Sequence, residues 1–573
     1  MTTSRRGFLA STALLGVGAT LPRVARAQPT SPRPGTPATS PQPGTAPPGP
    51  ADIAAGTIAE AEKLAGIEFT EAERVQMGRT LPEQVGMFGS RRELGWLPND
   101  LAPAHVFDPR LPGMKFDTVQ RPIVRSGGAP PMPGTDEDIA YAPLTLLAKW
   151  IEIKAVTSTR LTEIYLERLK RLDPKLKAVI TLTEEHARAR AKKADAEIAA
   201  GNYRGPLHGV PYGAKDLFDT AGIRTTWGAE PWKDRVPTSD AAAIKRLDDA
   251  GAVLIAKTSL GALAYGDIWH GGRTNNPWNL KQGSSGSSAG SAATTAAGCV
   301  GFSIGTETYG SILSPSMVCG TTGLRPTFGR VSRAGAMALC WSLDKIGPIC
   351  RGVEDAALVL SVLNGRDDAD PSSIAMPFNF DATRQVRGVR VGYNPAWFEG
   401  RAAHDIDRAA LAAMKKLGVE MVEIELPEWP YQCLLTILET EAAAAFEEMT
   451  RTNADDQLSW QADQAWPNTF RQCWFIPAVE LVQAERVRRR VMAMMAERFE
   501  KVDVIFGPSQ AANLCLITNM TGHPQLTLRA GFREDGTPRG VTVWGRLFDE
   551  GTLCAVGMGL EKELGVWGRR PGV

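Results

Sequence analysis

The chain has 573 residues and is nearly neutral, with 64 Lys and Arg against 63 Asp and Glu, so its charge indicates neither nucleic acid nor an anionic membrane as a partner. Its 43% apolar residues can bury a large core, as one large α/β domain or as two smaller ones. The eight scattered cysteines form no C-x-x-C pair, which argues against a zinc site and against a disulfide framework. The triple Arg488-Arg489-Arg490 falls in a helical pattern and is interpreted as a solvated face.

The N-terminus has the parts of a twin-arginine signal peptide: Arg5-Arg6, a weakly apolar run to Leu21, and a cleavage pattern at Ala25-Arg26-Ala27. We expect residues 1–27 to be removed on export, which leaves a periplasmic or secreted chain from about Gln28 with a net charge of about −3. The apolar run is too short for a membrane span, which needs about 20 apolar residues, so no stable membrane insertion is expected.

Two non-catalytic segments are predicted after the signal. Residues 28–51 are rich in proline, glycine and threonine and are interpreted as an extended linker. Residues 52–140 form an N-terminal extension, helical from Asp52 to Met77 with a capping-box pattern at Thr70 and Glu73. From Leu81 onward the extension lacks clear periodicity, and we expect it to lie over the main body.

Residues 141–573 are predicted to form the catalytic domain. Apolar residues recur at helical spacing from Leu161 to Leu172, and Pro174 is expected to stop that helix. A charged helix is predicted at 184–200, and buried strands at 252–256 and 300–304. Helices that alternate with short buried strands predict an α/β architecture around a mostly parallel or mixed sheet.

Glycine-flanked serines dominate residues 286–326, where Ser287-Ser288 and Ser311 stand on either side of a small-residue helix and a short apolar strand. A serine hydroxyl becomes a nucleophile when a base takes its proton, and the oxyanion it creates needs donors already aimed at it. The segment is therefore typical of nucleophilic chemistry on a carbonyl.

Three other chemistries fit the residues less well. GSSAG at 286–290 formally matches the nucleophile elbow of α/β-hydrolases, with Ser288 as nucleophile, but the preceding residues 275–283 are polar and broken by proline instead of forming a buried strand. A phosphate-binding loop would need G-K-[ST] after the glycines. Metal-dependent hydrolysis lacks an H-E-x-x-H motif, and the six histidines have no ligand-like spacing.

A fourth chemistry uses a lysine as the base, and the motifs that would supply it resemble those of a known family. Lys215 in GVPYGAKD, GSSAGSAA at 286–293 and GTETYGSILSP at 305–315 closely resemble the amidase signature family. Further segments of the same resemblance occur in the family's order: GAVLIAKT at 251–258, NPWN at 276–279, DKIGP at 344–348 and NMTGHP at 519–524. The likeness covers about residues 141–560.

This resemblance implies a Ser-Ser-Lys triad on a single large domain, with a central mixed β-sheet covered by helices on both faces. Ser311 matches the nucleophile, Ser287 the bridging serine on a cis peptide, and Lys215 the general base. The oxyanion hole matches the backbone N–H groups of Thr308, Tyr309, Gly310 and Ser311. Neither a cofactor nor a metal is implied.

The base must be a neutral amine at pH 7, so the pKa of Lys215 must fall about 3 units from about 10.4, which burial would supply. Lys257 is the nearest rival base, but it ends a predicted buried strand at a position that the family does not use for chemistry.

Three residues depart from the family pattern. Tyr309 stands for a glycine beside the predicted oxyanion hole, Leu313 for an arginine near the nucleophile, and Ala289 for the first glycine after the serine pair. None of them removes a triad member, so they bear on substrate class more than on mechanism. Tryptophans near the motifs are candidates for an aromatic-tolerant pocket or for core packing: Trp227, Trp269, Trp278 and Trp341.

The expected function is hydrolysis of a linear amide, through a Ser311 acyl-enzyme, to a carboxylate and an amine or ammonia. Two alternatives stay open: an ammonia-supplying amidotransferase A-subunit, and a non-catalytic amide-binding protein that lost turnover through Tyr309. The expected partners are a small-molecule amide and, as one option, a second copy in a homodimer.

Overall fold

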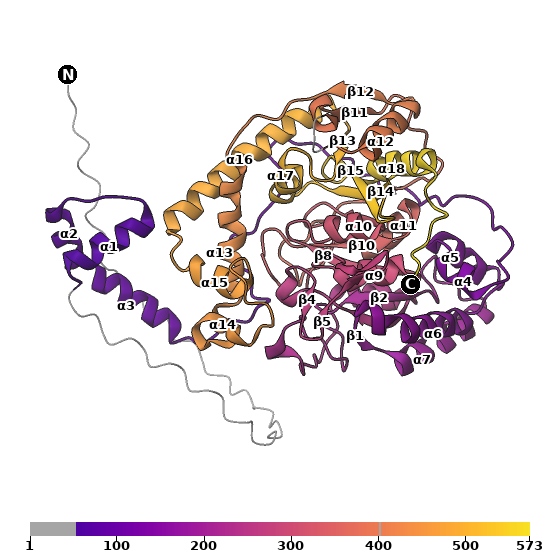
Figure 1. Ribbon diagram of the computed structural model, residues 1–573, viewed down its shortest axis with the longest axis horizontal. Coiled ribbons are helices and arrows are strands. Elements are labelled where there is room, and N and C mark those ends of the chain that lie inside the picture. The colour runs from indigo at the N-terminus through magenta and orange to yellow at the C-terminus, as the bar shows by residue number, and fades with distance from the viewer. Residues whose placement is uncertain (1–52, 400–402) are drawn as a thin grey trace, which may run out of the picture. The chain divides into compact units, whose positions relative to one another are not determined.

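The computed structural model describes residues 53–399 and 403–573, and an eleven-stranded sheet forms its centre (Figure 1). The predicted signal peptide and linker lie outside the described residues. The strands, from one edge to the other, are β1 (Val179–Leu182), β3 (Val253–Thr258), β2 (Pro211–Lys215), β8 (Phe302–Glu307), β10 (Lys345–Cys350), β9 (Thr322–Arg325), β14 (Gln525–Phe532), β15 (Pro538–Gly545), β13 (Val504–Pro508), β11 (Arg390–Tyr393) and β12 (Glu420–Glu423).

The sheet is mixed, as predicted. β2 pairs in parallel with β3 and β8, and β11 with β12 and β13, whereas β10 is antiparallel to both of its neighbours. β3 and β8, which overlap the two predicted buried strands and end two or three residues later, are buried along their whole length. All described residues belong to one compact unit, so the prediction of a single large α/β domain is confirmed.

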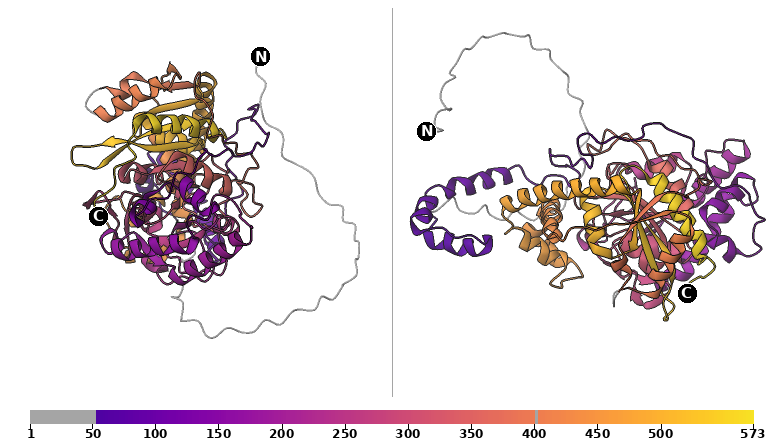
Figure 2. Two further views of the ribbon diagram at one scale, coloured as in Figure 1. Left: turned by 90° about the vertical axis from the view of Figure 1, so that its right-hand side faces the viewer. Right: turned by 90° about the horizontal axis from the view of Figure 1, so that it is seen from above.

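Helices cover both faces of the sheet (Figure 2). On one face α9 (Ala289–Ala296) packs on β8 and β10, and α10 (Leu313–Cys319) packs on β9, β14 and β15. Helices that pack on the strands elsewhere or flank the sheet are α4 (Asp136–Tyr141), α5 (Leu144–Glu152), α6 (Ser158–Leu176), α7 (Glu184–Ala199), α8 (Ala242–Asp249), α11 (Val353–Leu363), α12 (Asp405–Lys416) and α18 (Glu550–Leu564). A further group comprises α13 (Leu435–Ala445), α14 (Glu447–Thr452), α15 (Trp466–Cys473), α16 (Ala478–Lys501) and α17 (Leu514–Thr521).

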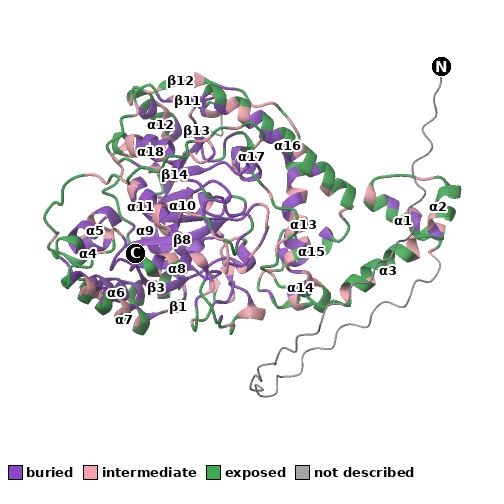
Figure 3. Ribbon diagram, turned by 180° about the vertical axis from the view of Figure 1, so that it is seen from behind, coloured by how far each residue is buried: buried purple, intermediate pink, exposed green. Residues whose placement is uncertain are grey.

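Contacts at single strand residues show which helix covers each face of the sheet. A side chain at Gly305 of β8 would collide with Ser288, at the start of α9. Leu526 of β14 instead reaches Gly557 of α18, where an added Cβ would lie 2.2 Å from it. The strands in the middle of the sheet are almost entirely buried, whereas the edge strand β12 has no buried residue (Figure 3).

The N-terminal extension begins with three helices: α1 (Ala55–Ala65), α2 (Glu71–Gly78) and α3 (Leu81–Arg92). The predicted capping box at Thr70 and Glu73 is present, but the segment 52–77 is not one helix. Gly66 ends α1 in a left-handed conformation with φ 66°, which glycine adopts without a Cβ penalty. Beyond α3 the chain runs over the body, where Val124 N donates to Phe380 O and Phe107 packs on Phe328.

Two local predictions were wrong. α6 does not stop at Pro174 but continues to Leu176, because a proline near the last turn leaves one carbonyl unbonded without preventing the turn from closing. Arg488 does not lie on a solvated face: its side chain is buried, donates to Met520 O and Ser342 O, and stacks over Phe107.

All eight cysteines are free, and six of them are buried. The fold thus rests on packing and hydrogen bonds. Among the described helices, none combines the length and the apolar content that crossing a membrane requires.

Candidate active site

Lys215 is the last residue of β2 and is completely buried. Its Nζ donates to Ser287 Oγ at 2.7 Å, to Thr306 Oγ1 at 2.8 Å and to Thr306 O at 3.4 Å. Ser287 precedes α9, and Thr306 belongs to β8, which lies beside β2 in the sheet. The parallel pairing of β2 and β8 therefore brings the lysine to the serine segment.

Burial lowers the pKa of Lys215 to about 7, while the negative charges of Asp344 and Glu307 oppose that shift. The desolvation penalty falls on the charged form, so it favours the neutral amine. A lysine with this pKa is about half neutral at pH 7 and can accept a proton there.

Ser287 and Ser288 have different surroundings. The Gly286–Ser287 peptide bond is cis, and Ser287 Oγ faces Lys215. Ser288 Oγ donates to Thr306 O at 3.1 Å and accepts from Thr306 N at 3.3 Å, so both capacities of this hydroxyl are used in tying α9 to β8.

The nucleophile elbow finds no support in this geometry. An elbow needs a buried strand directly before its serine. Here the preceding strand is β7 (Asn279–Gly283), which pairs only with β6 (Asn275–Asn276) in a small hairpin and is largely exposed. Ser288 itself is fully buried.

Ser311 lies in the turn between β8 and α10 and is 8% exposed. It lines a cavity of about 450 Å³. Its carbonyl oxygen accepts from Ser288 N at 3.2 Å, which holds it beside the serine pair. Within the described residues, the hydroxyls of Ser287 and Ser311 do not form a hydrogen bond with each other. The structure thus joins Lys215 to Ser287 directly, and brings Ser311 next to them through backbone.

The turn from Thr308 to Ser311 carries the predicted oxyanion donors. Gly310 has φ 84°, a conformation that favours glycine. In residues 53–399 and 403–573, the N–H groups of Tyr309, Gly310 and Ser311 donate to no other protein group. Thr308 is positioned by its side chain, whose Oγ1 donates to Asp344 Oδ1 at 2.6 Å.

The buried carboxylate of Glu307 holds the residues after the turn in place by hydrogen bonds, a role that the sequence motifs did not predict. Its carboxylate accepts from the N–H groups of Ile312 and Leu313 at 2.8 and 2.9 Å, and from Arg325 at 2.6 Å. Although burial alone would raise the pKa of Glu307, these partners, led by the charge of Arg325, hold it below its usual value. The signal for this network was the pair of opposite charges at 307 and 325 inside otherwise uncharged motifs.

The cavity at Ser311 has an apolar and a polar part. Tyr309, one of the three departures, is 41% exposed and lines it. The other aromatic rings of the lining are Tyr265 and Trp466, and Glu439 and Asp463 add carboxyl groups. Of the remaining departures, Leu313 is buried in α10 and Ala289 in α9.

The four tryptophans that were candidates for this pocket do not line it. Trp227 and Trp341 line a neighbouring cavity, whereas Trp269 is buried in the core and Trp278 packs on Phe532. The prediction placed them by sequence distance from the motifs, but the tryptophan that lines the Ser311 cavity comes from the start of α15, far along the chain.

Lys257, the rival base, has a structural role. Its Nζ lies 3.3 Å from the buried carboxylate of Asp216 and donates to Phe218 O at 2.7 Å. It also donates to Thr225 Oγ1. No nucleophilic serine is among these partners, and the lysine fixes the loop after β2.

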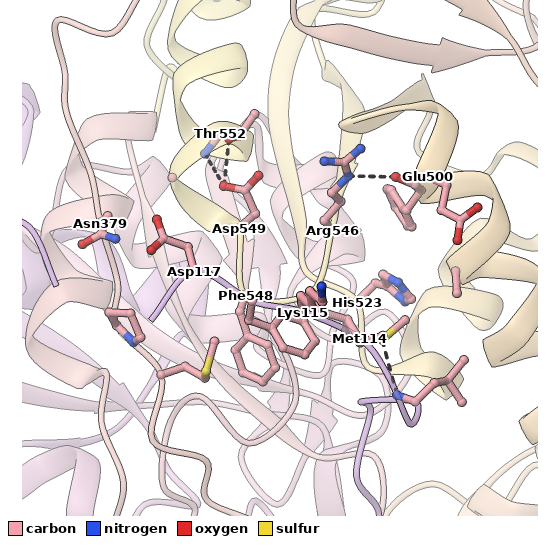
Figure 4. Close-up of a pocket in the computed structure, with 18 of the residues that line it drawn as sticks. Met114, Lys115, Asp117, Asn379, Glu500, His523, Arg546, Phe548, Asp549 and Thr552 are labelled. Atoms are coloured by element: carbon pink, nitrogen blue, oxygen red, sulfur yellow. Dashed lines mark hydrogen bonds between the residues drawn. The ribbon is translucent and has the colours of Figure 1, made fainter. Parts of the chain in front are cut away.

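A cavity of about 980 Å³ lies away from these residues (Figure 4). Extension residues such as Met114 and Lys115 line it together with Arg546 and His523. Burial lowers the pKa of His523 to about 3, and this ring is neutral and packed against Phe499. No serine lines this cavity, so its size does not make it the amide site. Among the described residues no group of three His, Cys, Asp or Glu side chains is arranged to hold a metal ion.

Fold and site together define an α/β protein with a buried lysine hydrogen-bonded to a serine, and a second serine in an adjoining cavity. The family model described as Amidase matches residues 160–517. The chain belongs to the amidase family, whose members act as hydrolases on amide C–N bonds.

Several relatives agree with this assignment. The chain is 34% identical over 450 residues to the glutamyl-tRNA(Gln) amidotransferase A-subunit of Roseiflexus sp. (strain RS-1), covering 70% of this chain and 92% of the relative. It is also 34% identical over 458 residues to an amidase of Pseudomonas putida, covering 73% of this chain and 95% of the relative. The native peptide amidase of Stenotrophomonas maltophilia superposes with a TM-score of 0.67 at 28% identity, covering 75% of this chain and 98% of that one.

Proposed function

We propose that the protein hydrolyses a linear amide to a carboxylate and an amine or ammonia through an acyl-enzyme on Ser311. The observation that carries the proposal is the 2.7 Å contact of Lys215 Nζ with Ser287 Oγ, next to the cavity that Ser311 lines. The reaction needs only groups of the chain and water. Lys215 is the base, Ser287 the proton relay and Ser311 the nucleophile.

In the acylation step, neutral Lys215 takes the proton of Ser287 while Ser287 takes that of Ser311. Ser311 Oγ then bonds to the amide carbon, and the C=O electron pair moves onto oxygen. The N–H groups of residues 308–311 donate to this oxyanion; a single donor of this kind is worth about 10²–10³ in kcat. This step requires a hydrogen bond between the Ser311 and Ser287 hydroxyls.

The proton then returns from Lys215 through Ser287 to the departing nitrogen as the C–N bond breaks. Water attacks the ester carbon by the same relay, and the carboxylate leaves with Ser311 restored. The lysine pKa near 7 suits both directions, because in each half-reaction the amine must first accept a proton and then give it back.

Trapping the acyl-enzyme tests the nucleophile. A fluorophosphonate probe should label the wild-type protein and the Ser288→Ala variant, whose hydroxyl only ties α9 to β8. Labelling should be absent in Ser311→Ala with an unchanged circular dichroism spectrum. Unlabelled wild-type protein would favour the non-catalytic amide-binding alternative, and equal labelling of Ser311→Ala would contradict the assignment.

The amidotransferase alternative is supported by the relatives of that name. Such a protein would supply ammonia to partner chains, so the purified single chain should hydrolyse simple amides slowly or only glutamine. Release of ammonia from acetamide, benzamide and glutamine by the purified chain separates the two functions.

We propose further that the protein is exported through the twin-arginine route, on the basis of Arg5-Arg6 and the cleavage pattern ending at Ala27. Replacing both arginines by lysine should leave the protein uncleaved in the cytoplasm, and N-terminal sequencing of the periplasmic form should begin at about Gln28. An uncleaved cytoplasmic wild-type protein would refute the export proposal.

A further inference from the structure

A second cavity, of about 740 Å³, lies between the N-terminal extension and the catalytic body. Residues 96–99 and 101–103 form one wall, and α13, α14 and α15 contribute to the other. Six large aromatic rings line it: Trp96, Trp227, Trp232, Trp341, Phe446 and Trp474. Aromatic rings gathered around a cavity favour an aromatic occupant, because rings pair in stacked or edge-to-face contacts.

Three of these rings already form such an arrangement. The centroids of Trp227 and Trp232 are 4.9 Å apart, and each lies near Phe446, at 6.3 and 6.1 Å. The rings hold each other in place, so the wall is built before any ligand arrives. A ring pair of this kind contributes about 0.5–1.5 kcal/mol beyond its buried area.

Two polar atoms of the lining residues have no hydrogen-bond partner in the described part of the chain. Trp227 is only 8% exposed, and its Nε1 is buried and unpaired. Thr440 Oγ1 is also buried and has no hydrogen-bond partner in this part of the chain. A buried donor left unpaired costs about 1–3 kcal/mol, which favours a turn of the Trp227 ring that brings its buried N–H to an acceptor on the occupant.

The charges beside the cavity cancel each other. Arg91 and Glu447, which both line it, form a salt bridge at 2.6 Å. Arg451 also pairs with Glu447 and stacks on Trp96, and the carboxylate of Glu448, a further lining residue, balances the second positive charge. The occupant is therefore expected to be neutral.

Asn99 fixes the extension wall to the body. Its Nδ2 donates to Ala338 O at 2.9 Å, its Oδ1 accepts from Ala338 N at 2.8 Å, and its carbonyl oxygen accepts from Trp341 Nε1 at 3.1 Å. These three bonds clip segment 96–103 onto residues 338–341. This wall precedes residues 160–517, which the family model matches.

The aromatic cavity shares one lining residue with the cavity at Ser311. Cys473 lines both cavities. Leu339 lines the Ser311 cavity, and Trp341, two residues further along the chain, lines the aromatic one. Cys473 therefore marks the place where the two cavities adjoin.

We propose that this cavity binds a neutral aromatic group that carries a hydrogen-bond acceptor, and that this group is the distal part of the amide hydrolysed at Ser311. The substrate assignment rests on the proposed function, whereas the aromatic site does not. The substrate class is accordingly an amide whose acyl chain ends in a substituted aromatic ring, in contrast to short aliphatic amides.

Two probes test the proposal: 6-(4-methoxyphenyl)hexanamide, whose ether oxygen is an acceptor, and hexanamide, which lacks the ring. The cavity variant is Trp96→Ala, and its matched control is Trp567→Ala, because both tryptophans are 38% exposed and only Trp96 lines the cavity. In Trp96→Ala, kcat/KM for the aromatic amide should fall about tenfold while that for hexanamide stays unchanged. In Trp567→Ala neither value should change.

Binding measured without turnover tests the aromatic site separately from the substrate assignment. The full-length Ser311→Ala protein should bind the aromatic amide more tightly than hexanamide in calorimetric titration, and adding Trp96→Ala should remove the difference. Equal binding of both probes by Ser311→Ala would overturn the aromatic site. Absent hydrolysis together with Trp96-dependent binding would overturn the substrate assignment and the proposed function, but support the site. Hydrolysis with equal kcat/KM for the two probes would overturn the substrate assignment alone.

Discussion

Lys215 and Ser287 meet at 2.7 Å where the end of β2 faces the start of α9, and no solvent reaches either side chain. The contact couples two opposing requirements. Burial lowers the pKa of the amine to about 7, so that a neutral form able to accept a proton is present without histidine, and the same burial destabilises the fold when the amine is charged. Activity and stability should therefore respond to this one residue in opposite directions.

The rate of acylation should rise with pH around 7. The base must be neutral, so kcat/KM is expected to increase through the Lys215 pKa of about 7 and to level off above it. Lys215→Arg, which stays protonated, should lose at least about 10²-fold in kcat/KM at every pH. Stopped-flow acylation between pH 5 and 9 measures both, and a flat wild-type profile would refute the role of the lysine.

Replacing the lysine by methionine should stabilise the protein while it abolishes activity. The native pKa lies below the unfolded value of 10.5, so between about 7 and 10.5 the unfolded chain binds more protons and stability rises with pH. Below pH 7 the full penalty, roughly up to 5 kcal/mol, applies to the wild type and not to Lys215→Met. Thermal unfolding should show a higher Tm for the variant at pH 6.5, and a smaller gain at pH 9.5.

An unchanged or lower Tm of Lys215→Met at pH 6.5 would mean that the hydrogen bonds to Ser287 and Thr306 outweigh the desolvation of the charge. Lys257→Met serves as the comparison, since this lysine is equally buried but pairs with the carboxylate of Asp216. Its loss leaves that carboxylate uncompensated and should destabilise by about 3–5 kcal/mol.

Sequence motifs were sufficient to predict the mixed α/β sheet, because short-range patterns define strands. The motifs also named Lys215, Ser287 and Ser311, and the structure joins the first two by a hydrogen bond. What failed depends on long-range packing. Arg488 looks solvated from its neighbours in sequence, and only the approach of Phe107, far away in the chain, buries it. The ring that reaches the Ser311 cavity from α15, Trp466, likewise has no local signal.

Asp344 should set the pH at which the base works. Its charge raises the pKa of Lys215, so Asp344→Asn should move the midpoint of the acylation profile to lower pH. The asparagine can keep the local bonds: its oxygen accepts from the N–H groups of Leu339 and Cys340, and its amide donates to Thr308 Oγ1, where the aspartate now binds the same three groups. A midpoint that stays fixed or moves upward in stopped-flow acylation would contradict this electrostatic role.

Glu307→Gln should be strongly destabilising. The change leaves Arg325 buried without its counter-charge, and breaking a buried ion pair in this way costs about 3–5 kcal/mol. It also weakens the acceptor for the N–H groups of Ile312 and Leu313, directly after the nucleophile, so kcat should fall in the folded fraction. Urea unfolding and active-site titration measure the two effects separately.

An exposed pair provides the control for the ion-pair argument. Glu60→Gln removes the partner of Lys63, which lies 2.7 Å away on the surface of α1. Its cost should be below about 1 kcal/mol. Similar losses for the two glutamates would show that burial of Arg325 is not the cause.

Tyr309 should limit the size of the acyl group at Ser311. It stands where the family commonly has glycine, two residues before Ser311, and it lines the same cavity as Ser311, so its ring takes up space in that cavity. Tyr309→Gly should raise kcat/KM for α-branched acyl amides such as isobutyramide about tenfold relative to acetamide, because the removed ring relieves a steric clash worth about 1–3 kcal/mol. Tyr309→Phe keeps the ring and should behave as the wild type. If Tyr309→Gly instead slowed both amides equally, the tyrosine would be supporting the oxyanion turn and not shaping the pocket.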